Sequence, residues 1–187
     1  GCTVINDNCF HHIPDYIHDE QCLVIIDPPF LKSLRSTTGQ YSYEWEDEMH
    51  RVLLDVLTKE SYTSFVTDED LLFNTRPKGE YIKDKPRAKV ILFGFENEMY
   101  TKAFTSAETP WYQFILERPL LSSNKTSKNG EKEVQRKSFW INFLPSDYAK
   151  QYVPELNELV YLTPENLEEN LARDRKFLES RKKKTVD

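Results

Sequence analysis

Residues 22–29 read CLVIIDPP, and this stretch decides the fold that the sequence predicts. An apolar run without a polar interruption is typical of a central strand that is buried on both faces of a sheet. Proline has no amide N–H to donate to a neighbouring strand, so Pro28 and Pro29 end the strand. Asp27 is therefore predicted to lie at its carboxyl end.

Three segments follow this strand towards the middle of the chain. Residues 44–59 place apolar side chains at helical spacing after an acidic start, which predicts an amphipathic helix with His50 on a solvated shoulder. Residues 88–95 indicate a second buried strand, and residues 99–105 have the composition of an antiparallel return, so we expect a β-hairpin. Residues 111–121 are strongly apolar and fit a strand or a helix equally well.

The closing third alternates between strand and helix. Residues 138–144 and 159–162 are predicted strands, and a short helix that begins at residues 145–147 lies between them. This order favours parallel pairing of the two strands through a right-handed crossover. Thr163 and Pro164 then begin a last helix, because threonine suits the N-cap and proline the first turn.

Together these elements predict an α/β fold of three layers, with a mostly parallel central sheet flanked by helices. We expect an N-terminal arm at residues 1–20, a single domain at 21–180 and a basic C-terminal tail at 181–187. Residues 122–137 are polar and predict a flexible insertion loop. The side chains expected to be buried in the sheet are Leu23, Val24, Ile25, Ile26, Val90, Leu92, Phe139, Ile141 and Val160.

Charge and composition exclude several classes of function. The 187 residues include 25 Lys and Arg against 31 Asp and Glu, a net charge of −6, so nucleic acid or an acidic membrane would bind against the field of the protein. We therefore expect neither nucleic acid nor a membrane as a partner.

The three cysteines form no C-x-x-C pair and favour a reducing cytoplasm. His11 and His12 lie near Cys9, but their spacing matches no zinc site. The five glycines are isolated, which excludes a phosphate-cradling loop, and we expect no cofactor.

The order of elements resembles the von Willebrand factor A family. Residues 23–33 look like its first strand and top loop, residues 89–105 like its hairpin and residues 139–178 like its closing elements. The metal site of that family needs a D-x-S-x-S loop, whose hydroxyls and carboxylate bind a divalent cation. Here Pro29 and Leu31 replace the two serines, and no T-D-G motif is evident, so no metal is expected.

Within that family, the degenerate metal loop, the aromatic content and the Lys/Ser-rich insertion resemble kinase-activating scaffold domains of the yeast pheromone-response MAP kinase cascade. The resemblance implies a non-catalytic module that binds a MAP kinase kinase and promotes phosphorylation of its MAP kinase. Such a scaffold works in the cytoplasm and is recruited to the cell cortex or nucleus. A generic A-type adhesion or complex-assembly domain is a second interpretation.

An enzyme is the third interpretation. Asp27-Pro28-Pro29-Phe30 matches the D-P-P-[FY] signature of S-adenosylmethionine-dependent amino-methyltransferases, in which the loop binds the target amine and the aromatic ring stacks on it. These enzymes need a glycine-rich turn for the cofactor, normally upstream of the loop. Gly1 is the only glycine among the residues that precede Asp27, so this turn is missing. No Ser or Cys lies in a tight glycine-flanked turn either, and no catalytic residue is therefore predicted.

Loops at strand ends are frequent binding sites on open α/β sheets. Here these loops and the start of the last helix carry acidic and amide side chains, which would suit a basic kinase surface. We therefore expect a protein-binding surface formed by Asp27, Glu96, Asn97, Glu98, Asp147, Asn157, Glu158, Glu165, Glu168 and Glu169.

Overall fold

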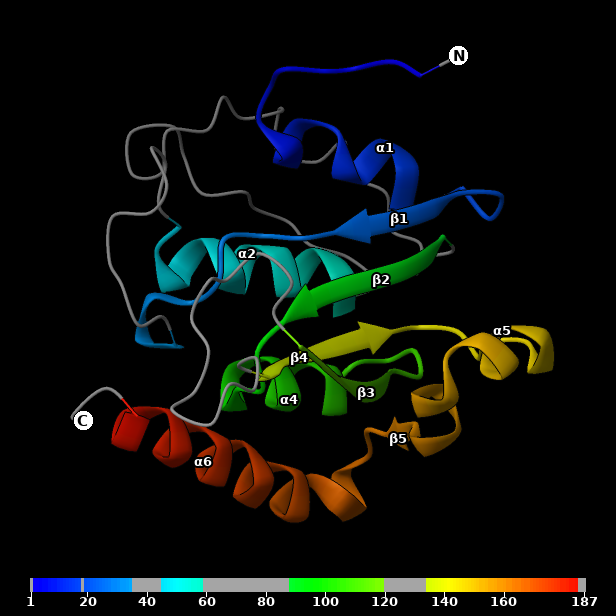
Figure 1. The fold of residues 1–187 in the computed structure, drawn as a ribbon. Helices are drawn as coiled ribbons and strands as arrows, with labels where there is room; N and C mark the ends of the chain where they lie inside the picture. Colours follow the sequence, from blue (N-terminus) through cyan, green and yellow to red (C-terminus); the bar gives the residue numbers. More distant parts are fainter. Residues whose placement is uncertain (1, 18, 35–44, 59–87, 120–133, 185–187) are drawn as a thin grey trace.

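A computed structural model describes residues 2–17, 19–34, 45–58, 88–119 and 134–184. It has a mixed α/β fold, in which five strands form one open sheet in the order β1-β2-β4-β3-β5 (Figure 1). The strands are β1 (Leu23–Ile26), β2 (Lys89–Gly94), β3 (Tyr112–Pro119), β4 (Val134–Ile141) and β5 (Val160–Tyr161). Of the ambiguous apolar segment 111–121, residues 112–119 thus form a strand.

The pairing of the strands differs from the expected mostly parallel sheet. Only β1 and β2 pair in parallel among the described strands, whereas β2 with β4, β3 with β4 and β3 with β5 are antiparallel. Both β4 and β5 are antiparallel to β3, so they run in the same direction, but β3 lies between them. The predicted direct pairing of these two strands is therefore wrong, and the three-layer A-type arrangement is not confirmed.

The strand expected at the centre, β1, lies at the edge of the described sheet. Ile26 is buried and Val24 is half-buried, but Leu23 and Ile25 are 53% and 59% exposed. Alternate side chains of a strand point to opposite faces, and only the face that carries Ile26 is covered here. The other expected core residues are buried, except for half-buried Val160.

The predicted β-hairpin is also wrong, because α4 (Glu98–Thr105) follows β2. The side chain of Asn97 accepts a hydrogen bond from the amide of Tyr100 at 2.9 Å and so caps the first turn. Tyr100 and Phe104 lie four residues apart and are buried on one side of this helix. The cap and this spacing outweigh the β-prone composition of residues 99–105.

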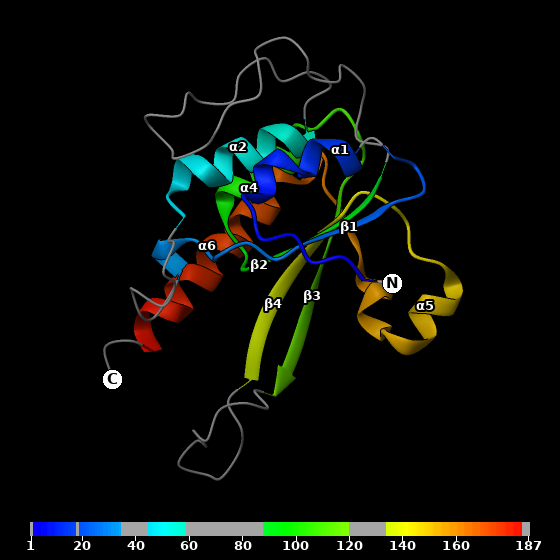
Figure 2. The same ribbon diagram turned by 90° about the horizontal axis from the view of Figure 1, so that it is seen from above.

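The helices are unequally divided between the two faces of the sheet (Figures 1 and 2). One face packs against α1 (Ile13–Ile17), α2 (Asp47–Thr58), α4 and α6 (Leu167–Lys184). The main core lies there and includes Leu53, Phe104, Trp111 and Trp140. The other face carries α5 (Asp147–Tyr152) and the 3-10 helix η3 (Pro154–Glu158) over a smaller core of Phe114, Phe139, Ile141 and Leu156.

Two shorter 3-10 helices and the chain ends complete the description. The 3-10 helix η1 (Cys9–His11) and α1 bring Phe10, Ile13 and Ile17 into the main core, and η2 (Lys32–Leu34) follows β1. The 3-10 helix η4 (Pro164–Asn166) leads into α6, as Thr163 and Pro164 predict. Residues 134–137 of the predicted insertion loop belong to β4, and its other residues lie outside the described part. Of the predicted tail, residues 181–184 belong to α6.

Candidate functional site

The ten residues expected to bind a partner separate into two groups at opposite ends of the sheet. The carboxyl ends of the parallel strands β1 and β2 lie at one end, with the start of β4 and the end of β3. The first group follows these strands and consists of Asp27, Glu96, Asn97 and Glu98. The other end, where α5, β5 and the start of α6 lie, carries Asp147, Asn157, Glu158, Glu165, Glu168 and Glu169 (Figure 1).

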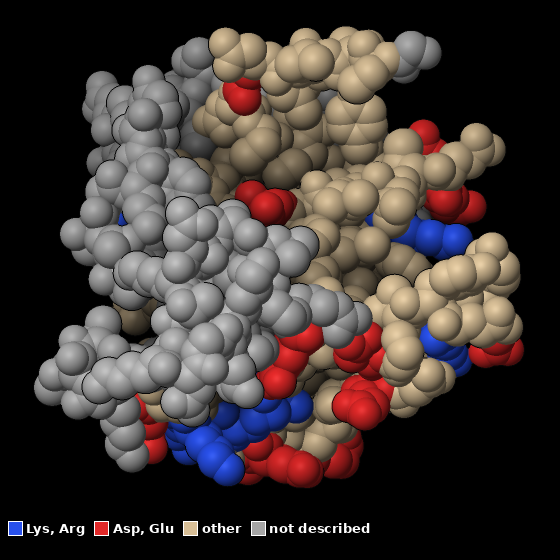
Figure 3. Space-filling model, viewed as in Figure 1, with Lys and Arg blue, Asp and Glu red and all other residues tan. Residues whose placement is uncertain are grey.

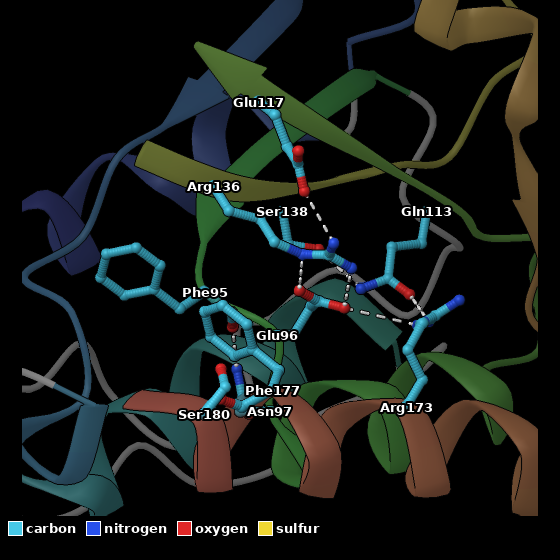
Figure 4. A network of polar contacts seen from close by, with 10 residues as sticks. All are labelled: Phe95, Glu96, Asn97, Gln113, Glu117, Arg136, Ser138, Arg173, Phe177 and Ser180. Carbon is cyan, nitrogen blue, oxygen red and sulfur yellow. Dashed lines mark hydrogen bonds and ion pairs between the residues drawn. The ribbon is translucent and has the colours of Figure 1, made fainter. Parts of the chain in front are cut away.

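Glu96 is the centre of a polar network inside the protein (Figure 4). Its side chain is 1% exposed and accepts two hydrogen bonds from Arg136 on β4, from Nε at 2.6 Å and from Nη2 at 3.0 Å. Arg173 on α6 lies with its Nε 3.5 Å from Glu96 Oε1. Arg136 also donates to Glu117 on β3 at 2.8 Å. The carboxylate of Glu96 is thus enclosed by two arginines and is not presented to a partner.

The network continues from α6 into the sheet (Figure 4). Arg173 donates to the side-chain oxygen of Gln113, and Gln113 donates to Ser138 Oγ at 2.6 Å. Gln113 and Ser138 are buried, so each needs this bond to offset its loss of water. The ring of Phe177 lies 5.9 Å from the guanidinium carbon of Arg136. These contacts fix α6 against β3 and β4.

The other predicted residues of this end are also engaged within the protein, apart from Asp27. Asn97 caps α4 and donates to the carbonyl of Phe95 at 2.8 Å. Glu98 pairs with Lys102 at 3.0 Å and with Arg175 at 2.9 Å, and these two bonds hold the pKa of its carboxyl below the usual range. Asp27 is exposed at the end of β1. Glu96 is therefore buried, whereas Asn97 and Glu98 are half-buried and bonded to neighbouring residues of the chain.

The opposite end brings exposed tyrosines together with the predicted acids. Tyr148 and Tyr152 on α5 are each 68% exposed, their ring centroids lie 5.0 Å apart and their hydroxyl oxygens 3.2 Å apart. Tyr161 on β5 is also exposed, and its ring centroid lies 5.2 Å from that of Tyr112. We call the following set the acidic–tyrosine surface: Asp147, Tyr148, Tyr152, Asn157, Glu158, Tyr161, Glu165, Glu168 and Glu169, all of which are exposed.

Local sequence explains why the tyrosines of α5 point outwards. Ser146 caps the helix by accepting a hydrogen bond from the amide of Ala149 at 3.2 Å. Ala149 and Val153 pack against the smaller core. Tyr148 and Tyr152 are four residues apart and lie on the solvent side of the same helix. The short helix therefore presents both rings as one exposed pair.

Asn166 positions the acidic part of this surface. Its side-chain oxygen accepts a hydrogen bond from the amide of Thr163 at 3.0 Å, and its side-chain nitrogen donates to the carbonyl of Tyr161 at 2.6 Å. Asn170 on α6 donates to the same oxygen at 2.8 Å. A hydrogen bond from the Thr163 hydroxyl lowers the pKa of Glu165. The side chain of Glu165 is therefore ionised at neutral pH.

The tyrosines of this surface were absent from the sequence prediction, which considered only acidic and amide residues. The signal was present in the sequence, because Tyr148 and Tyr152 alternate with the inward residues Ala149 and Val153 at helical spacing. Leu144, which is 68% exposed and precedes α5, was missed in the same way.

The D-P-P-F loop has a packing role in this structure. The ring of Phe30 lies 4.5 Å from that of Phe95 and 5.6 Å from Lys137 Nζ, and Pro28 is buried. Among the described residues, no group of three or more His, Cys, Asp or Glu side chains could hold a metal ion. Across the same residues, no helix has the length and apolar character needed to cross a membrane.

Comparison with known proteins gives no relative: no family model, curated protein or solved structure matches this chain. The site is therefore interpreted from its own geometry.

Proposed function

We propose that this chain is a non-catalytic protein-interaction module, and that the acidic–tyrosine surface is its binding site. The exposed pair Tyr148 and Tyr152 is the observation that carries the proposal. Tyrosine is enriched in protein interfaces because its ring supplies a large apolar area while its hydroxyl remains hydrogen-bonded. In isolation the two rings remain in water, and a partner that covers them would gain the free energy of their burial.

The partner that we propose is a MAP kinase kinase. The support is the sequence resemblance to kinase-activating scaffold domains, together with an acidic surface that complements a basic kinase surface. In this proposal the domain binds the kinase in the cytoplasm, or at the cortex or nucleus within a larger scaffold, and promotes phosphorylation of its MAP kinase. Kinship with the von Willebrand factor A family is part of the same proposal and rests on the order of the closing elements.

The negative charge would act mainly on association. Complementary charges steer the encounter and fix the orientation of the partners, and their effect falls as salt screens them. The tyrosine rings would instead contribute to the lifetime of the complex, because apolar burial is not screened. The two halves of the surface are therefore distinguishable by salt.

The test is a reconstituted reaction in which the candidate MAP kinase is phosphorylated by its upstream kinase with and without this domain. We expect stimulation by the native domain. The variant Tyr148→Ala with Tyr152→Ala should lose it at low and physiological salt, and Glu165→Lys with Glu169→Lys should lose it most strongly at low salt.

The matched control is Glu48→Lys with Glu179→Lys, which makes the same change of charge at exposed residues of α2 and the far end of α6. It should stimulate as the native domain does. Folded surface variants with undiminished stimulation would contradict the assignment of the surface. Absence of stimulation by the native domain would contradict the kinase partner and favour a generic assembly domain.

The methyltransferase interpretation predicts a different measurement. A protein that binds S-adenosylmethionine is stabilised by a saturating excess of it, so its melting temperature rises. We expect no rise for this domain. A rise that Asp27→Ala or Phe30→Ala abolishes would replace the proposed interaction module with an enzyme.

A further inference from the structure

The outer side of β1 presents backbone groups that its neighbour in the sheet does not use. The amide of Lys89 donates to the carbonyl of Cys22 at 3.0 Å, so Cys22, Val24 and Ile26 direct their backbone groups towards β2. The N–H and C=O groups of Leu23 and Ile25 consequently point away from β2. Within the described residues no strand pairs with this side. The edge therefore offers two donors and two acceptors to an added strand.

The side chains along this edge are apolar and open to solvent. Leu23 and Ile25 are more than half exposed on one face of the strand. Beside them lies a cavity of about 280 Å³, lined by β1, by Cys9 of η1, by His12 between the two helices, and by Ile13 and Tyr16 of α1. An unpaired apolar strand edge, here four residues long, is a site for strand addition, in which backbone hydrogen bonds supply affinity and alternate side chains enter neighbouring pockets.

The charges at the two ends of β1 identify the kind of strand that fits. Exposed Asp19 and Glu20 precede the strand, and exposed Asp27 follows it. In Figure 3 uncharged surface lies along β1, with acidic groups towards both of its ends and a basic group beside its start, where exposed Lys89 of β2 pairs with Leu23. A strand with apolar residues at alternate positions and Lys or Arg at both ends would match this pattern.

The same charges disfavour a second copy of this chain as the occupant. Two β1 strands paired antiparallel about a two-fold axis would bring Asp27 of one copy to the end that carries Asp19 and Glu20 of the other. Like charges at close range oppose such pairing, and each copy carries a net charge of −6. A basic partner strand has no such penalty.

We propose that the outer edge of β1 binds an extended segment of a partner protein, with basic ends and alternating apolar residues, as an added strand of the sheet. This inference deepens the proposed function and rests on it only in that the partner is a protein. The edge does not include any residue of the acidic–tyrosine surface. A peptide assay without kinase therefore tests the edge alone, and the reconstituted reaction tests the proposed function.

The probe is the fluorescent peptide KKVTVTVKK, and the readout is its anisotropy during titration with the domain. We compare it with EEVTVTVEE, which has acidic ends, and with KKVTVTVKK methylated at alternate backbone nitrogens, which has the same side chains but lacks half of the donors. Unmodified KKVTVTVKK should bind at least tenfold more tightly than either of the other two peptides. Equal binding of the methylated peptide, or no binding at millimolar domain, would overturn the proposal.

Two variants locate the binding on β1. Ile25→Pro removes an outward N–H but no hydrogen bond to β2, so the sheet should persist while peptide affinity falls at least tenfold. Glu20→Lys with Asp27→Lys should reverse the preference, so that EEVTVTVEE binds more tightly than KKVTVTVKK, and this variant leaves the backbone intact should the proline variant fail to fold. Leu144→Ala is the control at another exposed apolar side chain, 68% exposed against 59% for Ile25, and should bind as the native domain does.

Sedimentation of the domain alone completes the test. A monomer over the concentrations of the titration agrees with a free edge. A dimer that Ile25→Pro dissociates would show that a second copy occupies the edge and would overturn the proposal. Unchanged peptide preference in the folded lysine variant would also overturn it.

Discussion

Arg136 binds the buried carboxylate of Glu96 through two hydrogen bonds, at 2.6 Å and 3.0 Å, and so joins β4 to the turn that follows β2. The relationship is asymmetric. Glu96 is almost fully buried, whereas Arg136 is partly exposed and also pairs with the exposed Glu117. The bond with Glu96 is the first cause of a raised pKa at Arg136. Loss of the arginine should therefore be more harmful than loss of its exposed partner.

We predict that Arg136→Met lowers the free energy of unfolding by about 3 kcal/mol, because it leaves a buried carboxylate with only the longer contact to Arg173. Glu117→Gln, the matched control, should lower it by less than about 1 kcal/mol, since that pair is exposed. Urea unfolding measures both. Equal losses would contradict a special role for the buried contact.

The stability of the protein should depend on Asp174 at neutral pH. Asp174 is buried on α6 and accepts a hydrogen bond from Thr101 Oγ1 at 2.6 Å, while its other oxygen has no hydrogen-bond partner in the described part of the chain. Burial is the main cause that raises its pKa from 3.8 to about 6. The folded state therefore binds this proton more tightly than the unfolded state.

A raised pKa of a carboxyl means that its ionised form opposes folding. The penalty is fully present above pH 6, falls as the pH drops towards 3.8, and amounts to about 3 kcal/mol at most. We predict that Asp174→Asn, which keeps an acceptor for Thr101, raises the unfolding free energy at pH 8 and changes it little at pH 4. Unfolding curves at both pH values measure this, and the same difference at each pH would contradict it.

Gly94 marks a close approach between β2 and β4. A Cβ atom at this position would lie 2.8 Å from Cζ3 and 3.3 Å from Cη2 of Trp140, whose ring is fully buried. We predict that Gly94→Ala lowers the unfolding free energy by about 1–3 kcal/mol, because the ring has to shift within a packed core.

A double variant tests this cause directly. Trp140→Phe removes the ring atoms that would collide with the new methyl group. Gly94→Ala combined with Trp140→Phe should therefore be more stable than the two single losses together imply, by at least about 0.5 kcal/mol. Strictly additive losses would show that the glycine is needed for another reason.

Local signals predicted the fold where they acted within one element. The helix of residues 47–58 follows from its apolar spacing, and α6 from Thr163 and Pro164 at its start. Pairing between distant segments was not predictable in this way. Residues 22–26 have the composition of a central strand, yet they lie at the edge, because apolar composition does not determine which strands become neighbours.

Asn97 and His50 also show where prediction from local sequence signals fails. The pattern around Asn97 contained the N-cap of α4, but β-prone residues downstream suggested a hairpin instead. His50 was expected on a solvated shoulder, and it is fully buried, with Nδ1 2.7 Å from the hydroxyl oxygen of Tyr100 and its ring beside that of Trp45. Tertiary partners from other elements bury it, and helical spacing alone does not reveal them.

The exposure of the candidate site residues was predictable only where it depends on their position within one helix. Glu165, Glu168 and Glu169 are exposed as expected, because acids at the start of a helix face solvent and stabilise its dipole. Glu96 has the same residue type but is buried, since Arg136 and Arg173 arrive from β4 and α6. Sequence spacing carries no information on these two contacts.

Asn166 should be the residue that holds the start of α6 against β5, because its side chain joins Thr163, Tyr161 and Asn170 through three hydrogen bonds. We predict that Asn166→Ala lowers the unfolding free energy by about 1–2 kcal/mol. Asn166→Asp should lose less, because it still accepts from the amide of Thr163 and adds a negative charge near the positive end of the helix. Urea unfolding ranks the three proteins, and hydrogen exchange at the amide of Thr163 should quicken only in the alanine variant. An alanine variant as stable as the native domain, or an aspartate variant less stable than the alanine one, would contradict this role.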